Sequence, residues 1–129
     1  MGNFDLPRPT DAELAILRTL WKRGPSTVRQ ALESLNQDRE TGYTTALKLL
    51  QIMTEKGLVE RDESERTHVY RARLTQEQTQ LQLVGDLLDK AFGGSASQLV
   101  LQALATKPAS ADELAEIRRL LDELEGDAQ

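Results

Sequence analysis

The chain of 129 residues is 39% hydrophobic, which is enough to fill the core of one domain with an appendage or the cores of two small units. It contains no cysteine, which excludes disulfide scaffolds, thiolate catalysis and cysteine-ligated metals. It has no apolar run of the roughly 18 residues that span a bilayer and no signal-peptide pattern in residues 1–9, so a cytoplasmic location is expected. The net charge of −5 would argue against nucleic-acid binding, but this charge is unevenly distributed. Residues 1–74 hold 12 Lys/Arg against 11 Asp/Glu, whereas residues 75–129 hold 4 against 10, so the acidity belongs to the second half.

The first predicted helix follows an arm, residues 1–9, whose two prolines block helix formation. Thr10 and Glu13 form a capping-box signature at its start, and Gly24-Pro25 ends it. Its apolar residues recur at helical spacing: Leu14, Ile16, Leu17, Leu20 and Trp21.

A second helix is predicted over residues 27–36, with Ser26 as its N-cap. One face is apolar and consists of Val28, Leu32 and Leu35. Residues 36–42 are polar and predict a loop.

The third predicted helix, residues 43–58, has one apolar and one polar side when wound at about 100° per residue. Its apolar side consists of Ala46, Leu49, Leu50 and Met53, and its polar side of Thr44, Lys48, Gln51 and Glu55. Gly57 can adopt the left-handed C-cap conformation that ends a helix. Taken alone, the polar side is typical of a solvated helix face, but it is also typical of a recognition helix.

The apolar period changes to two after Gly57, which predicts a hairpin. Its strands are residues 58–61 and 67–71, joined by a polar turn over residues 62–66. Three helices followed by a hairpin make a winged helix-turn-helix, in which the third helix enters a groove of DNA and the hairpin lies along its backbone. The acidic residues of the turn make the wing a weaker signal for DNA than the helix.

Three further helices are predicted in residues 75–129, and they begin near Thr75, Gln98 and Ser110. Their apolar stripes exceed what about 50 residues can bury on themselves, so an identical subunit is expected to cover them. The expected fold is mostly α, with a winged-helix DNA-binding domain, residues 1–74, and a helical dimerisation domain, residues 75–129.

Several segments resemble the penicillinase-repressor family (BlaI/MecI/CopY). Residues 10–21, TDAELAILRTLW, resemble its opening helix, and residues 43–59, YTTALKLLQIMTEKGLV, resemble its recognition helix. Val69-Tyr70-Arg71 is similar to the second wing strand. The dimerisation tail is matched by Leu99-Val100-Leu101, Asp112-Glu113-Leu114 and Ile117. The resemblance implies a homodimeric repressor that binds a palindromic operator. In the best-known members of the family, a membrane-bound sensor protease or its signal relieves repression, so the resemblance makes such a protease a candidate partner.

The chain departs from the family pattern at three places. Ile52 stands where members often have arginine. The proteolysed Asn-Phe pair is replaced by Gln102-Ala103, so the resemblance does not carry cleavage control to this bond. The paired C-terminal cysteines of copper-responsive members are absent, which excludes copper sensing by thiolates.

The predicted site residues form three sets. Residues expected to contact DNA are Thr44, Thr45, Lys48 and Gln51 on the third helix, Arg66, Thr67 and His68 on the wing, and Ser26, Thr27 and Arg29 at the second helix. Residues expected at the dimer interface are Leu83, Leu87, Leu88, Phe92, Leu99, Leu101, Leu104, Ile117, Leu120, Leu121 and Leu124. Gln102 and Ala103 mark the possible proteolysis site.

No enzyme is expected, because the chain has no nucleophile elbow, Gly-rich phosphate loop or metal-ligand spacing, and its single histidine, His68, has no clustered partner. No catalytic residue, metal or cofactor is therefore predicted. Two alternatives stay open at this point: a winged helix that binds protein and not DNA, and a dimeric regulator released by a small molecule.

Overall fold

The computed structural model describes residues 6–36 and 40–128. Residues 1–5 of the predicted arm and residues 37–39 of the predicted loop lie outside the described residues. The chain divides into two compact units, Met1–Val84 and Gly85–Gln129. In the described part of the chain, no helix is long and apolar enough to cross a membrane.

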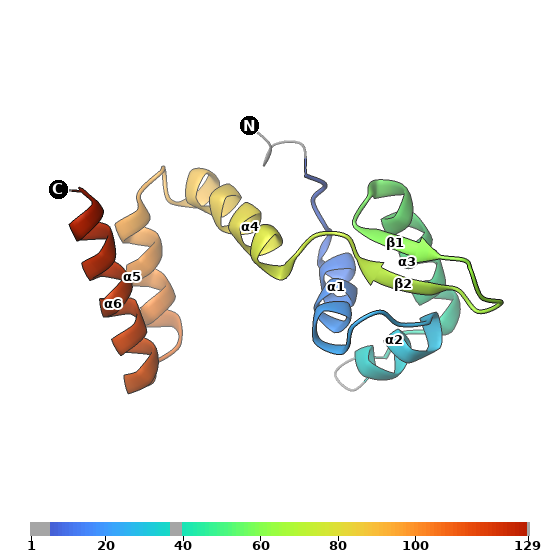
Figure 1. Ribbon diagram of the computed structural model, residues 1–129. Helices are drawn as coiled ribbons and strands as arrows, with labels where there is room; N and C mark the ends of the chain where they lie inside the picture. The colour runs from blue at the N-terminus through green and yellow to red at the C-terminus, as the bar shows by residue number, and fades with distance from the viewer. Residues whose placement is uncertain (1–5, 37–39, 129) are drawn as a thin grey trace. The chain divides into compact units, whose positions relative to one another are not determined.

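The first unit contains three helices, a hairpin and the first part of a fourth helix (Figure 1). In chain order these are α1 (Asp11–Arg23), α2 (Val28–Leu35), α3 (Tyr43–Lys56), β1 (Val59–Asp62), β2 (Val69–Ala72) and the beginning of α4 (Gln76–Ala91).

Side-chain caps fix where α1 and α2 begin, and a left-handed glycine ends α3. The predicted capping box of Thr10 and Glu13 is present at α1, with both reciprocal hydrogen bonds formed. The prediction for α2 was wrong by one residue, because Thr27 and not Ser26 is the N-cap and Gln30 completes its capping box. Gly57 ends α3 in the predicted left-handed conformation, with φ of 83°.

The hairpin pairs β1 with β2 antiparallel, from Val59 opposite Ala72 to Asp62 opposite Val69. Both strands begin later than predicted, because the N–H of Leu58 still bonds to the α3 carbonyl of Met53 and because residues 67 and 68 belong to the turn. Ser26 also pairs with Tyr70 through two backbone hydrogen bonds of 2.9 and 2.7 Å. Three helices and this hairpin form the predicted winged helix-turn-helix.

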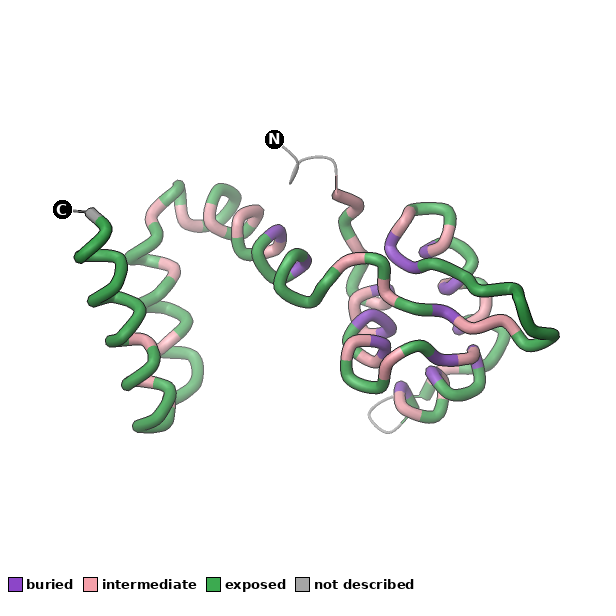
Figure 2. Tube along the Cα trace, viewed as in Figure 1, coloured by how far each residue is buried: buried purple, intermediate pink, exposed green. Residues whose placement is uncertain are grey.

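Side chains from every element of the winged helix meet in one core. Figure 2 marks the buried positions of the chain in purple along the Cα trace. On α3 the buried residues are Ala46, Leu50 and Met53, as the apolar period predicts, while Leu49 is half-buried. The remaining apolar core consists of Ile16, Leu17, Leu20, Val28, Ala31, Leu35, Leu58, Val59 and Tyr70. This packing fixes α3 with its polar side outward.

The first part of α4 is attached to the winged helix. The indole Nε1 of Trp21 donates a 3.0 Å hydrogen bond to the carbonyl of Leu74, immediately before the helix. The buried amide of Gln82 donates to the carbonyl of Leu6 at 2.9 Å. The compact units therefore divide inside α4, at Val84 and Gly85, whereas the sequence places the domain boundary between residues 74 and 75; that domain assignment stays a prediction.

The second unit contains the end of α4, α5 (Ala96–Thr106) and α6 (Ala111–Ala128). Helix α5 begins two residues before its predicted start, because Ser95 caps it by accepting from the N–H of Gln98. The predicted cap of α6 is present, with Ser110 and Glu113 hydrogen-bonded reciprocally. No described side chain between Gly85 and Asp127 is buried.

Candidate nucleic-acid interface

The outward side of α3 is polar and unobstructed. Thr44, Lys48 and Gln51 are exposed, while the opposite side of the helix is buried in the core. Lys48 has no ion pair or hydrogen bond to another described residue, so its ammonium group is available to a partner. These side chains carry the donors and acceptors that read base edges in the major groove.

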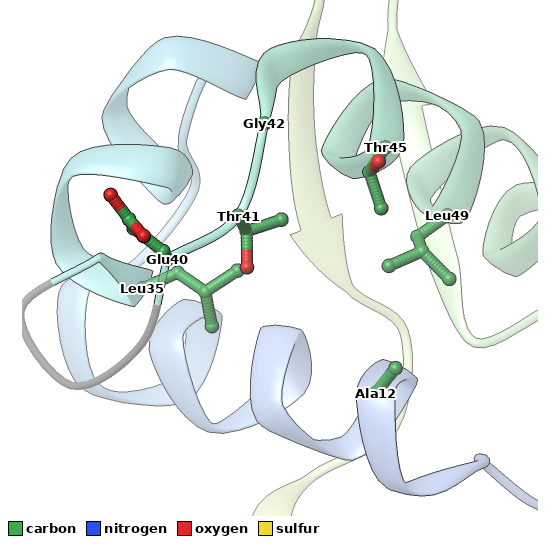
Figure 3. Close-up of a pocket in the computed structure, with 7 residues that line it drawn as sticks. All are labelled: Ala12, Leu35, Glu40, Thr41, Gly42, Thr45 and Leu49. Carbon is green, nitrogen blue, oxygen red and sulfur yellow. The ribbon is translucent and has the colours of Figure 1, made fainter.

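One flank of α3 borders a small pocket. Thr45 and Leu49 line it together with Ala12 of α1 and the segment that precedes α3, as Figure 3 shows. Its volume of about 210 Å³ is below the roughly 300–1,000 Å³ of typical small-molecule sites. Thr45 therefore lies at the edge of the polar side, and the pocket provides no argument for an effector.

The other flank of α3 borders a larger hollow of about 560 Å³. Tyr43 and Leu47 line it from α3. The α2 end and the wing contribute the rest of its wall: Thr27, Val28, Arg29, Arg66, Thr67, His68 and Tyr70. The structure thus brings together five of the predicted DNA-contacting residues from segments about 40 positions apart in sequence.

The N-terminus of α2 presents donors and positive charge to this hollow. The capping box uses the N–H groups of Thr27 and Gln30. No hydrogen bond within the described part of the chain uses the N–H groups of Val28 and Arg29, which belong to the four donors that a helix start leaves free. Such a helix end favours phosphate.

Tyr43 is a site residue that sequence reasoning missed. Its ring lies 5.7 Å from the guanidinium carbon of Arg29, within the range of a cation–π contact. Tyr43 is 45% exposed and lines the hollow. Only the packing of α2 against α3 places the two side chains together, so the sequence contains no local signal for the pair.

Two of the acidic residues of the wing, Glu60 and Glu63, are paired with basic side chains. Glu63 lies 3.4 Å from Arg61 and 3.8 Å from His68. The guanidinium of Arg71 donates a 2.6 Å hydrogen bond to the carboxylate of Glu60, and this bond is the main reason that the pKa of the Glu60 carboxyl is lowered. Arg66 has no ion-pair partner among the described residues and is exposed.

Ser26 does not belong with the outward-facing residues. It is 1% exposed, and its hydroxyl donates a 2.8 Å hydrogen bond to the carbonyl of Gly24. Its backbone pairs with Tyr70 at the root of the wing. Its buried side chain serves the fold and offers no contact to DNA.

The residues predicted for the dimer interface are uncovered in the single chain. Leu83, Leu88, Phe92, Leu99, Leu104 and Ile117 are half-buried, and the other five are between 45% and 61% exposed: Leu87, Leu101, Leu120, Leu121 and Leu124. Gln102 and Ala103 are exposed on α5. Apolar exposure of this extent indicates an interaction surface.

Known proteins similar to this chain are regulators. The penicillinase repressor family matches it over residues 9–123. The transcriptional regulator BlaI of Mycobacterium tuberculosis is 35% identical over 121 residues, covering 93% of this chain and 87% of that protein. The penicillinase repressor of Bacillus licheniformis is 21% identical over 118 residues, covering 92% of each chain.

Solved structures support the fold. The DNA-binding domain of the repressor BlaI matches with a TM-score of 0.50 at 20% identity, over 57% of this chain and 89% of that chain. The Bacillus licheniformis BlaI monomeric form in complex with the blaP half-operator gives the same TM-score, identity and coverage. Both are winged helices, so the likeness agrees with the element order described above.

Proposed function

Because the chain belongs to the penicillinase repressor family and is thus a DNA-binding transcriptional repressor, we propose that it occupies a palindromic operator as a homodimer, with α3 in the major groove of each half-site. The observation that carries this proposal is the polar side of α3 beside a hollow that α2 and the wing line with donors and positive charge.

Two kinds of contact to DNA have different roles in this proposal: contacts to base edges and contacts to phosphates. Lys48, Gln51 and Thr44 face outward and read base edges, with Thr45 at the border of the same surface. The N-terminus of α2, Arg29 and the wing residue Arg66 bind phosphates, which supplies affinity without sequence choice. Thr67 and His68 line the hollow beside Arg66 and complete the backbone contact.

Dimerisation relies on the exposed apolar residues of α4, α5 and α6. Residues 75–129 form the dimerisation domain in this proposal. Burying side chains that are about half exposed in one chain would stabilise the dimer by roughly 25 cal/mol for each Å² removed from water. Two tethered half-site contacts then gain effective concentration on a palindrome.

The repressor acts where the chromosome lies, which places it in the cytoplasm. Its release involves either a membrane-bound sensor protease or a ligand. Gln102 and Ala103 do not form the Asn-Phe pair that the family's known proteases cut, which favours cleavage elsewhere or release of the intact protein.

A mobility-shift assay tests the proposal. The full-length protein is expected to retard a duplex from its own upstream region at nanomolar concentration, and an unrelated duplex of equal length only at far higher concentration. The upstream duplex should shift directly to a complex of two subunits. Equal retardation of both duplexes at every salt concentration would overturn the proposed operator recognition.

A further inference from the structure

One side chain joins the segment that leads into α3 to the end of α2. The carboxamide of Asn36, the C-cap residue of α2, pairs with both polar backbone groups of Thr41. Its Nδ2 donates to the Thr41 carbonyl at 3.1 Å, and its Oδ1 accepts from the Thr41 N–H at 2.8 Å. Because an amide side chain offers a donor and an acceptor as a peptide group does, Asn36 bridges the two helices of the helix-turn-helix directly before α3 begins.

The first turn of α3 has few other constraints. Residues 43–45 are exposed, and Gly42, the N-cap, has no side chain that could accept their N–H groups. Besides the two bonds of the Asn36 carboxamide, no hydrogen bond within the described part of the chain joins residues 40–45 to another helix or strand. The segment before the turn borders the small pocket of Figure 3 and is not packed into the core. The contact of Tyr43 with Arg29 holds a side chain and leaves the backbone of the turn unbonded.

The core fixes α3 only from Ala46 onward. Ala46, Leu50 and Met53 are buried, with at most 1% exposure. Lys48 and Gln51 lie between these buried residues in sequence, so packing of the core holds their part of the helix in place. Thr44 precedes the first buried residue, and its position therefore depends on the geometry of the first turn.

We propose that Asn36 is a positioning residue for operator recognition, because it holds the first turn of α3 in the orientation in which Thr44 reads its base pair. The inference rests on the proposed function, since it needs α3 in the major groove. Asn36 acts through Thr41 and the turn, and its two hydrogen bonds limit the base edges that Thr44 can reach. Loss of these bonds should remove sequence preference at the base pairs that the first turn reads and preserve it elsewhere.

The test measures sequence preference at each base pair. Full-length wild-type protein and each variant select binding sites from a library of random-sequence duplexes, and sequencing gives the preference at every position. Thr44→Ala and Lys48→Ala identify the base pairs that depend on the first turn and on the middle of α3. Asn36→Ala should lower the preference at the Thr44-dependent base pairs by a factor of about five, since two exposed hydrogen bonds contribute about 2.3-fold each. It should keep the preference at the Lys48-dependent base pairs.

Asn36→Asp is a second variant. Its carboxylate can still accept from the Thr41 N–H, but its other oxygen faces the Thr41 carbonyl and can donate no hydrogen bond. This variant should lose at least as much preference at the same base pairs, whereas its added negative charge should weaken binding to all sequences alike.

Gln78→Ala is the matched control. The Oε1 of Gln78 accepts a 2.9 Å hydrogen bond from the N–H of Thr75, also at an exposed position, at the start of α4. This variant should show a small loss of stability in thermal melts, similar to that of Asn36→Ala, and should keep the wild-type preference at every base pair.

The outcomes separate the positioning role from the proposed function. An unchanged profile for both Asn36 variants, a loss that is equal at all base pairs, or the same loss in Gln78→Ala would overturn the positioning role alone. Thr44→Ala with a wild-type profile would overturn it as well, because the first turn would then read no base. Wild-type protein that selects no sequence from the library would overturn the proposed operator recognition and the positioning role with it.

Discussion

Single residues at the interface differ in what they can contribute to DNA binding. Lys48 stands at the centre of the polar side of α3, where a base edge would lie in the major groove. Arg66 stands on the wing, where the DNA backbone would lie. Both side chains lack an ion-pair partner among the described residues, so neither must break a contact before it binds.

Substituting these two residues should separate base reading from phosphate binding. Lys48→Ala should relax the preference at one base pair per half-site by about 1–3 kcal/mol. Arg66→Ala should weaken binding to all sequences and reduce the salt slope by about one unit. Fluorescence anisotropy on a panel of single-base operator variants at several salt concentrations measures both effects. Lys107→Ala, at the end of α5, is the control, and wild-type behaviour of both interface variants would show that the helix and the wing are misassigned.

The ring of Tyr43 should orient Arg29 toward a phosphate. Tyr43→Leu removes the cation–π contact and should cost about 0.5–1 kcal/mol of operator affinity, whereas Tyr43→Phe retains the ring and should bind as wild type does. A double-mutant cycle with Arg29→Gln, measured by the same anisotropy assay, isolates the pair. Additive effects of Tyr43→Leu and Arg29→Gln would contradict the assigned contact.

At the scale of elements, α1 and α3 are joined by a partly buried ion pair. The ammonium of Lys56 lies 2.6 Å from the carboxylate of Glu13, which is 3% exposed. Burial alone would raise the pKa of Glu13, but the hydrogen bond from Lys56, aided by those from Thr10, lowers it below the ordinary value. A lowered carboxyl pKa stabilises the fold at neutral pH, and this stability is lost as the pH falls through the folded-state pKa.

Removing either charge should therefore have unequal and pH-dependent effects. Glu13→Gln retains the capping box and should cost about 1–2 kcal/mol at pH 7, less than a fully buried charged hydrogen bond because Lys56 is about one-third exposed. Lys56→Met leaves a buried carboxylate alone and should cost more. Urea unfolding at pH 7 and at a series of lower pH values measures the differences, which should shrink as the pH falls through the folded-state pKa of Glu13. Glu33→Gln, which removes the exposed ion pair with Arg23, is the control. If the loss of unfolding free energy caused by Glu13→Gln and Lys56→Met did not depend on pH, the stabilising role of the Glu13–Lys56 ion pair would be refuted.

Local signals predicted most of the elements, and tertiary contacts decided the rest. The caps at Thr10, Thr75 and Ser110 and the apolar period of α3 depend on residues within one or two turns, so the sequence shows them directly. The pairing of Ser26 with Tyr70 depends on a contact over more than 40 residues, which no local pattern encodes. The same holds for Tyr43 beside Arg29, so the sequence predicted which side of α3 faces outward but not the residue that lines the hollow beside it; the DNA contacts themselves stay a prediction.

Helix α5 carries the bond that would be cut if control followed the family pattern. Ala103 offers a single methyl group where the Asn-Phe pair offers an aromatic ring, and both Gln102 and Ala103 lie inside the helix. Wild-type protein should therefore stay intact at this bond in cells where it has been released from DNA, as measured by mass spectrometry. A variant with Gln102→Asn and Ala103→Phe should be cut when co-expressed with a sensor protease of a well-known family member. Cleavage of the wild-type chain between Gln102 and Ala103 would refute the prediction.

At the scale of the whole molecule, the two halves of the chain differ both in net charge and in the number of buried residues. Residues 1–74 are nearly neutral and form a core of their own, whereas residues 75–129 are strongly acidic and, beyond Gln82, contain no buried described residue. The acidic charge lies away from the predicted DNA contacts in sequence, so repulsion from phosphates is kept out of the binding domain. In the proposed dimer, the uncovered apolar residues of the same half would form the surface through which two copies associate.

Two truncations should distinguish the structural boundary inside α4 from the one predicted at residue 74. A chain ending at Val84 keeps Thr79 and Gln82 buried, so it should fold as a monomer that binds one half-site as well as the full chain does. On the palindrome it should bind about 10²–10⁴ times more weakly, because the second contact is no longer tethered. A chain ending at Leu74 also loses the hydrogen bonds of Gln82 to the arm and should melt at least about 4 °C lower than the longer truncation, since 1 kcal/mol shifts Tm by about 4–8 °C in a domain of this size. Sedimentation, mobility-shift assays and thermal melts check these outcomes. Full-length protein that is monomeric at micromolar concentration would contradict the assignment of the tail as the dimer interface. Equal melting temperatures of the two truncations would contradict Val84 as the end of the first unit.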